Sequence, residues 1–199
     1  MPSIRRVGSA LALAATLGGT LAAGEAQAQD GAWYTYLGGA GEGNQSGARG
    51  YSRVTLDGDD LTIFFRWSGL TAPTTIAHVH CCTAAPRTGN AIPATPVPSF
   101  PGFPAGVFAG SYTRTFDLTL ESSYNPGFVA AAGGIDAART RLLDGMTDSR
   151  AYLNIHTTTF PMGEIRGYYQ VVPEPGTWAL LGTGLVGLGV VARRRRQTA

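Results

Sequence analysis

Seven short segments in which apolar and polar residues alternate dominate the middle of the chain. They are rich in aromatic and β-branched residues, are bounded by Gly, Pro or Asp, and cover Trp33–Leu37, Tyr51–Leu56, Leu61–Trp67, Thr74–His80, Ser111–Leu120, Ala151–His156 and Glu164–Val171. Alternation with a period of two is typical of strands that bury one face. Asp57-Gly58-Asp59-Asp60, between two of the segments, is typical of a hairpin turn. The sequence therefore predicts an all-β fold, an Ig-like or Greek-key β-sandwich, with a Greek-key barrel as the alternative.

One region breaks the β pattern. Asn125-Pro126 is a good N-cap and first-turn pair, and Gly133-Gly134 ends the short apolar run that follows it. Apolar residues then recur every three to four positions, at Ile135, Ala138, Leu142 and Met146. This spacing indicates a second helix. We expect residues 124–147 to form a short helical crossover over one end of the sandwich, with its apolar stripe in the core.

Two long loops are expected between the strands. Residues 83–106 hold six of the 12 prolines, and because proline lacks an amide donor this segment cannot supply central strands. Its Phe100 and Phe103, together with Phe108 just beyond it, either pin the loop to the sheet, which we favour, or present apolar surface to a glycan or a protein. The Gly-rich residues 38–50 lack the strand-to-helix context of a phosphate-binding loop, so we interpret them as a mobile loop.

The N-terminus has the pattern of an export signal. Arg5 and Arg6 precede the small and apolar residues Val7–Ala23, and Ala26-Gln27-Ala28 then gives the small-x-small pattern that a signal peptidase cuts. An N-terminal membrane anchor is the alternative, which the weak hydrophobicity of the Ala- and Gly-rich stretch disfavours. Residues 1–28 are therefore predicted to be a signal peptide, and the protein to be exported.

The C-terminus has a three-part layout. Pro173-Glu174-Pro175 precedes the uncharged residues Gly176–Ala192, and Arg193-Arg194-Arg195-Arg196 follows them. The uncharged stretch is at the lower length limit for a transmembrane helix, and the Arg cluster places its end in the cytoplasm.

This layout resembles the PEP-CTERM sorting signal of Gram-negative bacteria. The resemblance implies that residues 173–199 are recognised by an exosortase, that the helix anchors the protein in the membrane until it is removed, and that the product reaches the cell surface or extracellular matrix. A permanent C-terminal anchor is the alternative.

The two signals leave one domain, residues 29–172, whose composition excludes several functions. It holds nine arginines against eleven acidic residues, a net charge of about −2. Nucleic-acid-binding domains normally carry a clear excess of positive charge, so we expect no nucleic-acid partner. The domain has no Gly-x-Ser-x-Gly motif, and its acidic residues fall mainly at turns, unlike a paired-carboxylate glycosidase site. We therefore expect that the protein is not an enzyme.

All three histidines lie in predicted strands. His78 and His80 are two residues apart, so they share a strand face with each other and, if the strand continues, with Cys82. A His-x-His pair joined by His156 from another strand would supply three nitrogen ligands for copper or zinc. Alternatively, the imidazoles bind neighbouring backbone groups and no metal. The main expectation is that there is no cofactor, with copper or zinc as the alternative.

Cys81 and Cys82 are adjacent and, after export, lie in an oxidising compartment. Successive Cα atoms are about 3.8 Å apart, below the usual span of about 4.4–6.8 Å for a disulfide. A bond between the two would therefore be strained and easily reduced. Two buried thiols, one thiolate joining the histidines, and a bond to another chain are the alternatives.

Three ordered motifs resemble a known family. Ala77-His78-Val79-His80, Tyr152–Thr157 and Phe160–Gly167 together are similar to the CHRD domain, which occurs in chordin and in many exported bacterial proteins. The resemblance implies an extracellular β-sandwich module. The usual small residue after His80 is replaced here by the Cys81-Cys82 pair. The His-x-His strand is also similar to that of Cu/Zn superoxide dismutase, so a superoxide-dismutase-like barrel is the alternative fold. The further histidines and the metal-bridging ligand of that enzyme are missing.

Glu164 and Arg166 share a face of the last predicted strand. They could form an ion pair or serve a ligand, and we favour a role in orienting that strand through hydrogen bonds to the His156 loop. The function expected overall is that of a surface or matrix protein that binds polysaccharide or a protein partner. A copper- or zinc-binding module, with a redox role as one form of it, is the second hypothesis.

Overall fold

The computed structural model describes residues 31–172, 182–186, 188 and 193. The predicted signal peptide, the sorting residues Pro173, Glu174 and Pro175, and most of the predicted membrane span Gly176–Ala192 lie outside the described residues. Within the described part of the chain, no helix is both long enough and apolar enough to cross a membrane.

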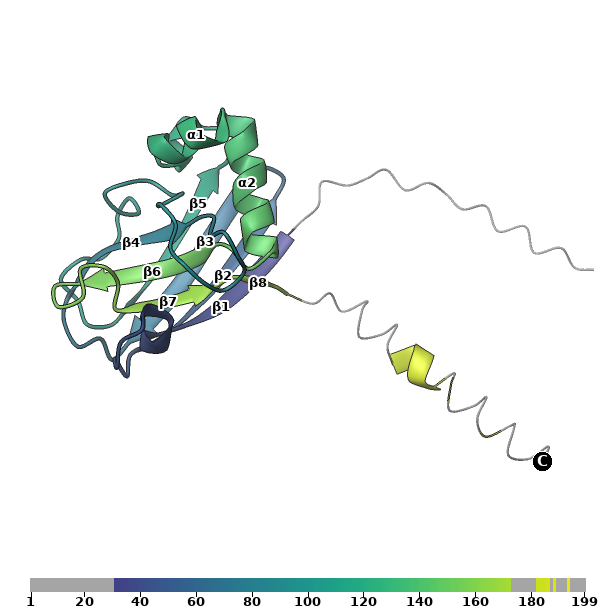
Figure 1. Cartoon of the computed structure of the whole chain (residues 1–199), viewed down its shortest axis with the longest axis horizontal. Helices are drawn as coiled ribbons and strands as arrows, with labels where there is room; N and C mark the ends of the chain where they lie inside the picture. The colour runs from purple at the N-terminus through teal and green to yellow at the C-terminus, as the bar shows by residue number, and fades with distance from the viewer. Residues whose placement is uncertain (1–30, 173–181, 187, 189–192, 194–199) are drawn as a thin grey trace, which may run out of the picture.

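Eight antiparallel strands form a single sheet that curls into a half-barrel (Figure 1). The strands are β1 (Gly31–Gly38), β2 (Arg49–Asp57), β3 (Asp60–Ser68), β4 (Thr74–His80), β5 (Gly110–Asp117), β6 (Tyr152–Thr157), β7 (Ile165–Tyr168) and β8 (Gln170–Val171). Their order across the sheet is β4-β6-β7-β1-β2-β3-β5, and β8 pairs with β1. β4 and β5 therefore lie at the two edges.

The inner face of the sheet carries the hydrophobic core. Trp33 of β1, Val54 of β2 and Ile63 of β3 are register partners, and each has a relative exposure of 5% or less. The residues between such positions point outward, as the alternation of the sequence predicts. Burying one side chain of this size contributes about 1.5–3 kcal/mol. All the described strands and the described hydrophobic core lie within residues 31–172.

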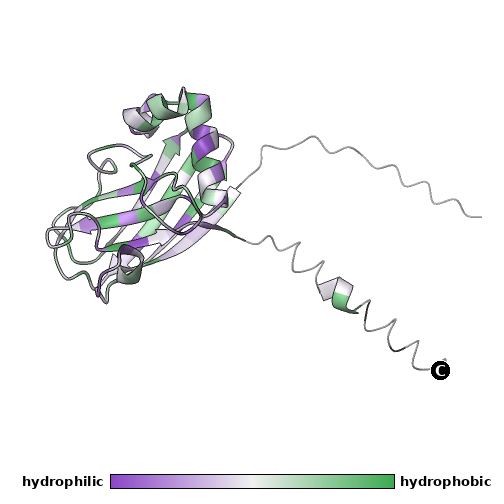
Figure 2. Ribbon diagram, in the orientation of Figure 1, coloured by the Kyte–Doolittle hydropathy of each residue, from purple (hydrophilic) through white to green (hydrophobic). Residues whose placement is uncertain are grey.

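The two predicted helices are confirmed and cover one end of the curled sheet (Figure 1). They are α1 (Pro126–Ala132) and α2 (Ile135–Thr147). The Asn125 side chain accepts a hydrogen bond from the Gly127 amide and caps α1, which Gly133 ends in the left-handed conformation, with φ of 96°. Hydrophilic and hydrophobic residues mix along α2 (Figure 2), and its buried residues include Ala138, Leu142 and Met146. The apolar stripe is thus part of the core.

The proline-rich loop runs beside β4 and also contacts the other edge strand, because the Tyr112 hydroxyl of β5 donates to Pro101 O at 3.0 Å. Its backbone contacts β4 through bonds such as Ala94 N–H to Val79 O, 2.8 Å. Phe100 is buried, and Phe103 packs against Phe65 with 6.0 Å between ring centres. Pinning is therefore confirmed for these two residues. It is wrong for Phe108, which is 52% exposed.

The mostly-β class is confirmed, and the differences from the expected strands are local. The strand predicted to reach Leu120 ends at Asp117, because the Asp117 carboxylate accepts hydrogen bonds from the Thr119 amide and hydroxyl and forms a turn. The last predicted strand is divided between β7 and β8, because the Tyr169 amide donates to Ala151 O instead of to a neighbour in β1. The described strands form one curled sheet, and the immunoglobulin-like and superoxide-dismutase-like assignments stay predictions.

Candidate metal centre

The three histidines meet on the outer face of the sheet. His78 and His80 lie on β4, and His156 lies on the neighbouring strand β6. The alternate β4 residues, Ala77 and Val79, belong to the core on the opposite face. The histidines are nevertheless buried, because the proline-rich loop and the loop after β6 cover them. One ring nitrogen from each lies within 4.8 Å of the others.

Each imidazole uses its other ring nitrogen to bind a backbone carbonyl. His78 Nε2 is 2.7 Å from Pro98 O, His80 Nδ1 is 2.8 Å from Ala91 O, and His156 Nδ1 is 2.9 Å from Pro161 O. A carbonyl oxygen only accepts, so each of these nitrogens carries the proton. The remaining nitrogen of each neutral ring therefore holds a lone pair.

These remaining nitrogens are His78 Nδ1, His80 Nε2 and His156 Nε2. All three are buried and have no hydrogen-bond partner in the described structure. A buried polar atom without a partner costs about 1–3 kcal/mol, and here each of three neighbouring rings has one such atom. Ligating histidines in metal sites typically donate their second ring nitrogen to a carbonyl or carboxylate, as these do.

The electrostatics keep the rings neutral. Burial lowers the pKa of His78 to about 4, with a further decrease from the nearby His156 and a partly offsetting increase from the bond to Pro98. Burial likewise lowers the pKa of His80 to about 4. Burial also lowers the pKa of His156, against the effect of the bond to Pro161. At neutral pH, all three lone pairs are free to bind a cation.

The donor set fits a first-row transition metal. Nitrogens bound to one tetrahedral zinc at about 2.0–2.1 Å lie about 3.4 Å apart, so the cluster would close by at most about 1.4 Å around an ion. Three imidazoles leave a fourth position open, as in many zinc and copper sites. The described cluster contains no carboxylate, which calcium and magnesium would require.

Cys82, predicted as a fourth member of this group, lies elsewhere. It is disulfide-bonded to Cys81, and its Sγ is 3.2 Å from Arg141 O of α2. β4 ends at His80, so the alternation that would have placed Cys82 beside the histidines stops before it. The bonded sulfur is no thiolate, and the prediction of Cys82 as a ligand is wrong.

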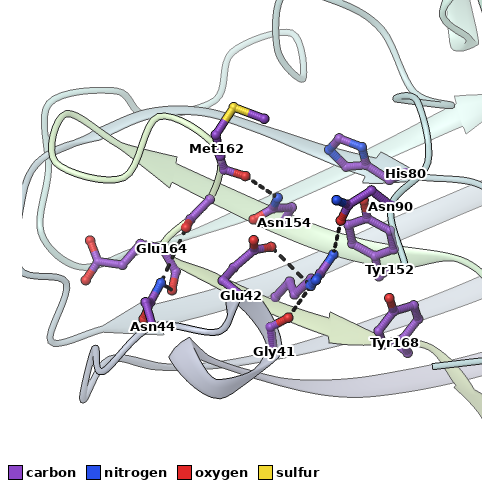
Figure 3. A network of polar contacts seen from close by, with 12 residues as sticks. Gly41, Glu42, Asn44, His80, Asn90, Tyr152, Asn154, Met162, Glu164 and Tyr168 are labelled. Atoms are coloured by element: carbon purple, nitrogen blue, oxygen red, sulfur yellow. Dashed lines mark hydrogen bonds and ion pairs between the residues drawn. The ribbon is translucent and has the colours of Figure 1, made fainter. Parts of the chain in front are cut away.

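A second network borders the histidines, and sequence reasoning missed most of it. Tyr152 of β6 stacks on His80, and the Arg166 guanidinium lies 4.9 Å from the centre of the Tyr152 ring. Arg166 pairs with Glu42 at 3.2 Å and donates to Asn90 Oδ1 at 2.8 Å and to Gly41 O (Figure 3). The ion pair considered between Arg166 and Glu164 is therefore replaced by one with Glu42. The strand alternation that places Tyr152 on the same face as His156 was the sequence signal that could have identified Tyr152 as a neighbour of the histidines.

Glu164 is fully buried and ties three segments together. Its carboxylate accepts hydrogen bonds from Ser46 Oγ at 2.7 Å, from the Thr71 amide at 2.7 Å and from Thr157 Oγ1 at 2.8 Å. Burial by itself raises the pKa of Glu164, but the hydrogen bonds outweigh it and the net pKa is lowered. Thr157 follows His156 directly, so Glu164 fixes the end of the strand that carries this histidine.

Comparison with known families agrees with these motifs. The family model of the CHRD domain matches residues 34–169, and that of the PEP-CTERM protein-sorting motif matches residues 171–196. No curated protein and no solved structure matches the chain. The sorting motif implies export, a membrane-anchored intermediate and processing by an exosortase. With two-thirds of its length matched, the chain belongs to the CHRD domain family and carries a C-terminal PEP-CTERM sorting motif.

Proposed function

We propose that this exported CHRD domain holds one copper or zinc ion through His78, His80 and His156, and that it acts as a non-enzymatic module of the cell surface or extracellular matrix. The observation that carries the proposal is the convergence of three buried, unpartnered imidazole nitrogens. Their carbonyl partners hold the rings in the tautomer that a metal requires.

A purely structural role for the histidines explains only one of the two nitrogens in each ring. The bonds to Pro98, Ala91 and Pro161 explain one nitrogen of each ring. They leave the second nitrogen buried without a partner, at a cost that a metal ion would remove. Imidazole nitrogen suits zinc and copper in particular.

The burial of the site favours a binding role over catalysis. His78, His80 and His156 are each less than 9% exposed, and the free nitrogens have almost no contact with solvent. A catalytic metal needs an open position that a substrate can reach. An ion here would instead link β4 to β6 beneath the two loops that cover the histidines.

The test is the metal content of residues 29–172, purified after export into a periplasm supplied with copper and zinc. The His78→Ala/His80→Ala/His156→Ala variant serves as the comparison, and a Cys81→Ser/Cys82→Ser variant as the control. We expect close to one metal per chain in the wild type and the cysteine control, and only traces in the histidine variant. Trace metal in all three proteins, with intact circular dichroism spectra, would refute the proposal.

A further inference from the structure

A shallow trough of about 700 Å³ lies next to the network of Figure 3, between β1, the loop that follows it, and β7. Three arginines line it, Arg49, Arg87 and Arg166, together with the aromatic residues Tyr36 and Tyr168. No Asp or Glu is among its lining residues. The trough is therefore a cationic and aromatic surface on a domain whose net charge is slightly negative.

The distribution of charge on the domain reinforces this difference. The exposed acidic residues of the described domain lie at the β2–β3 turn and on or near the helices: Asp57, Asp59, Asp60, Glu121, Asp136, Asp144 and Asp148. The two glutamates close to the trough do not offset its charge fully. Glu42 is already paired with Arg166, and Glu164 is buried among hydroxyl and amide donors. Arg49 and Arg87, both exposed, therefore give the trough a local positive potential.

The aromatic part of the trough is open and held in place. Tyr36 is 71% exposed, which is unusual for a large aromatic side chain. Its ring contacts Tyr51, with 5.4 Å between centres, and Tyr34, with 6.1 Å between centres. On the other side of the trough, the Tyr168 hydroxyl donates to Gly89 O at 2.9 Å. Rings fixed in this way lose little conformational entropy when a ligand binds.

We propose that this trough binds a carboxylated polysaccharide, with a sugar ring packed on Tyr36 and carboxylates paired with Arg87 and Arg49. The apolar face of a pyranose ring suits an exposed aromatic ring, and the planar guanidinium group suits a carboxylate, to which it can donate two parallel hydrogen bonds. Because two guanidinium groups line the same trough, more than one carboxylate of an acidic glycan can be paired there. The inference rests on the cell-surface or matrix role proposed above, but not on the metal ion.

Single-stranded nucleic acid is the competing polyanion, because it also uses aromatic and cationic surfaces. The net charge of about −2 on residues 29–172 and the acidic β2–β3 turn disfavour a long polyphosphate, whose binding depends on many released counterions. A carboxylated glycan needs only the local arginines. The two ligands are therefore separated directly in the experiment.

The experiment uses residues 29–172 and measures binding to polygalacturonate, to neutral dextran and to single-stranded DNA at 50 and 300 mM NaCl. Tyr36→Ala and Arg87→Gln are the trough variants. Phe108→Ala and Arg114→Gln are the matched controls, because both residues are exposed and lie outside the trough. We expect selective binding of polygalacturonate that weakens with salt, at least tenfold weaker binding in each trough variant, and no change in the controls.

Three results would overturn the inference: no binding of polygalacturonate by the wild type, equal or tighter binding of dextran or DNA, or equal losses in the controls. The metal-site variant is measured in the same series. Retained polygalacturonate binding in His78→Ala/His80→Ala/His156→Ala, whatever its metal content, would show that the two sites are independent. A wild-type protein that carries its metal but does not bind polygalacturonate would overturn this inference alone, and one that binds polygalacturonate without metal would overturn only the metal proposal.

Discussion

The imidazole of His80 and the phenol ring of Tyr152 lie parallel, with 4.9 Å between their centres and 4° between their planes. The Tyr152 hydroxyl also accepts a hydrogen bond from the Ala91 amide, and Ala91 O is the partner of His80 Nδ1. One tyrosine thus positions His80 twice, by stacking and through the loop backbone.

Replacing Tyr152 should therefore weaken metal binding without removing a ligand. We expect Tyr152→Leu to reduce the affinity for zinc or copper about tenfold or more, as is typical when a residue that orients a ligating histidine is lost. Tyr152→Phe keeps the stacking and loses only the bond to Ala91, so its effect should be smaller. Isothermal titration calorimetry measures both. Tyr168→Phe is the control, and equal affinities in all four proteins would contradict this role.

The metal-free domain should lose stability as the pH falls from about 6.5 to about 4. The pKa values of folded His78 and His80 are about 4, below the ordinary value of 6.5. The unfolded chain therefore takes up protons first as the pH falls, which favours unfolding. We expect a loss on the order of 3 kcal/mol. Urea unfolding at pH 7.5 and pH 4.5 measures it, and the triple histidine variant should show a clearly smaller loss.

The affinity for the metal should also fall with the pH, because the same histidines would take up protons. Protons compete with the ion for the imidazole lone pairs, so the bound metal should be retained at neutral pH and released as the pH approaches about 4. Dialysis at a series of pH values followed by elemental analysis tests this. Release that is complete at pH 6 would place the ion on groups with ordinary histidine pKa values.

Glu164→Gln should destabilise the domain although the change in shape is small. The carboxylate accepts bonds from Ser46, Thr71 and Thr157, and an amide cannot accept with both of its ends. We expect a loss of about 1–3 kcal/mol in the free energy of unfolding, measured with urea. Because the pKa of Glu164 is lowered by folding, its contribution is present above the ordinary pKa of 4.5 and disappears as the pH falls below it. Glu121→Gln, at an exposed position, should change neither the free energy of unfolding nor its dependence on pH.

Gly145→Ala should be destabilising in spite of the better helix propensity of alanine. A Cβ at residue 145 would overlap the Sγ atoms of Cys81 and Cys82, so α2 or the cysteine pair would have to move. Overpacking of this kind costs about 1–3 kcal/mol, against about 1 kcal/mol gained in propensity. Thermal unfolding measures the net effect. Gly127→Ala, where the nearest atom is 3.5 Å away, is the control and should not be destabilising for this reason.

The sequence predicted the parts of this protein that depend on local periodicity. Alternation located the strands, and the Asn125 cap with the spacing of Ala138, Leu142 and Met146 located the helices. The grouping of the three histidines followed from the same rule, because His78 and His80 share a face of one strand. Cys82 was misplaced because periodicity does not say where a strand ends.

Contacts between distant segments were beyond this reasoning. Arg166 was expected to have Glu164 as its partner, two residues away, but it pairs with Glu42 from the loop after β1. The trough joins Tyr36, Arg49, Arg87 and Tyr168, which lie on four separate segments. The register of β1 against β2 and β7 brings Tyr36, Arg49 and Tyr168 together, and the proline-rich loop adds Arg87. No pattern within one segment records these relationships.

The short strand β8 determines at which end of the domain the sorting motif begins. Its Val171 pairs with Trp33, close to the first residue of β1, so the chain leaves the domain at the end that also carries the β2–β3 turn. Three residues, Pro173–Pro175, then separate the domain from the predicted span, and their reach cannot exceed about 11 Å. The sorting motif, which begins at residue 171, therefore starts at the end of the domain that carries the acidic turn, and the loop after β1 that lines the trough lies at the opposite end of β1. The glycan-binding end proposed above thus lies away from the point where the sorting motif begins.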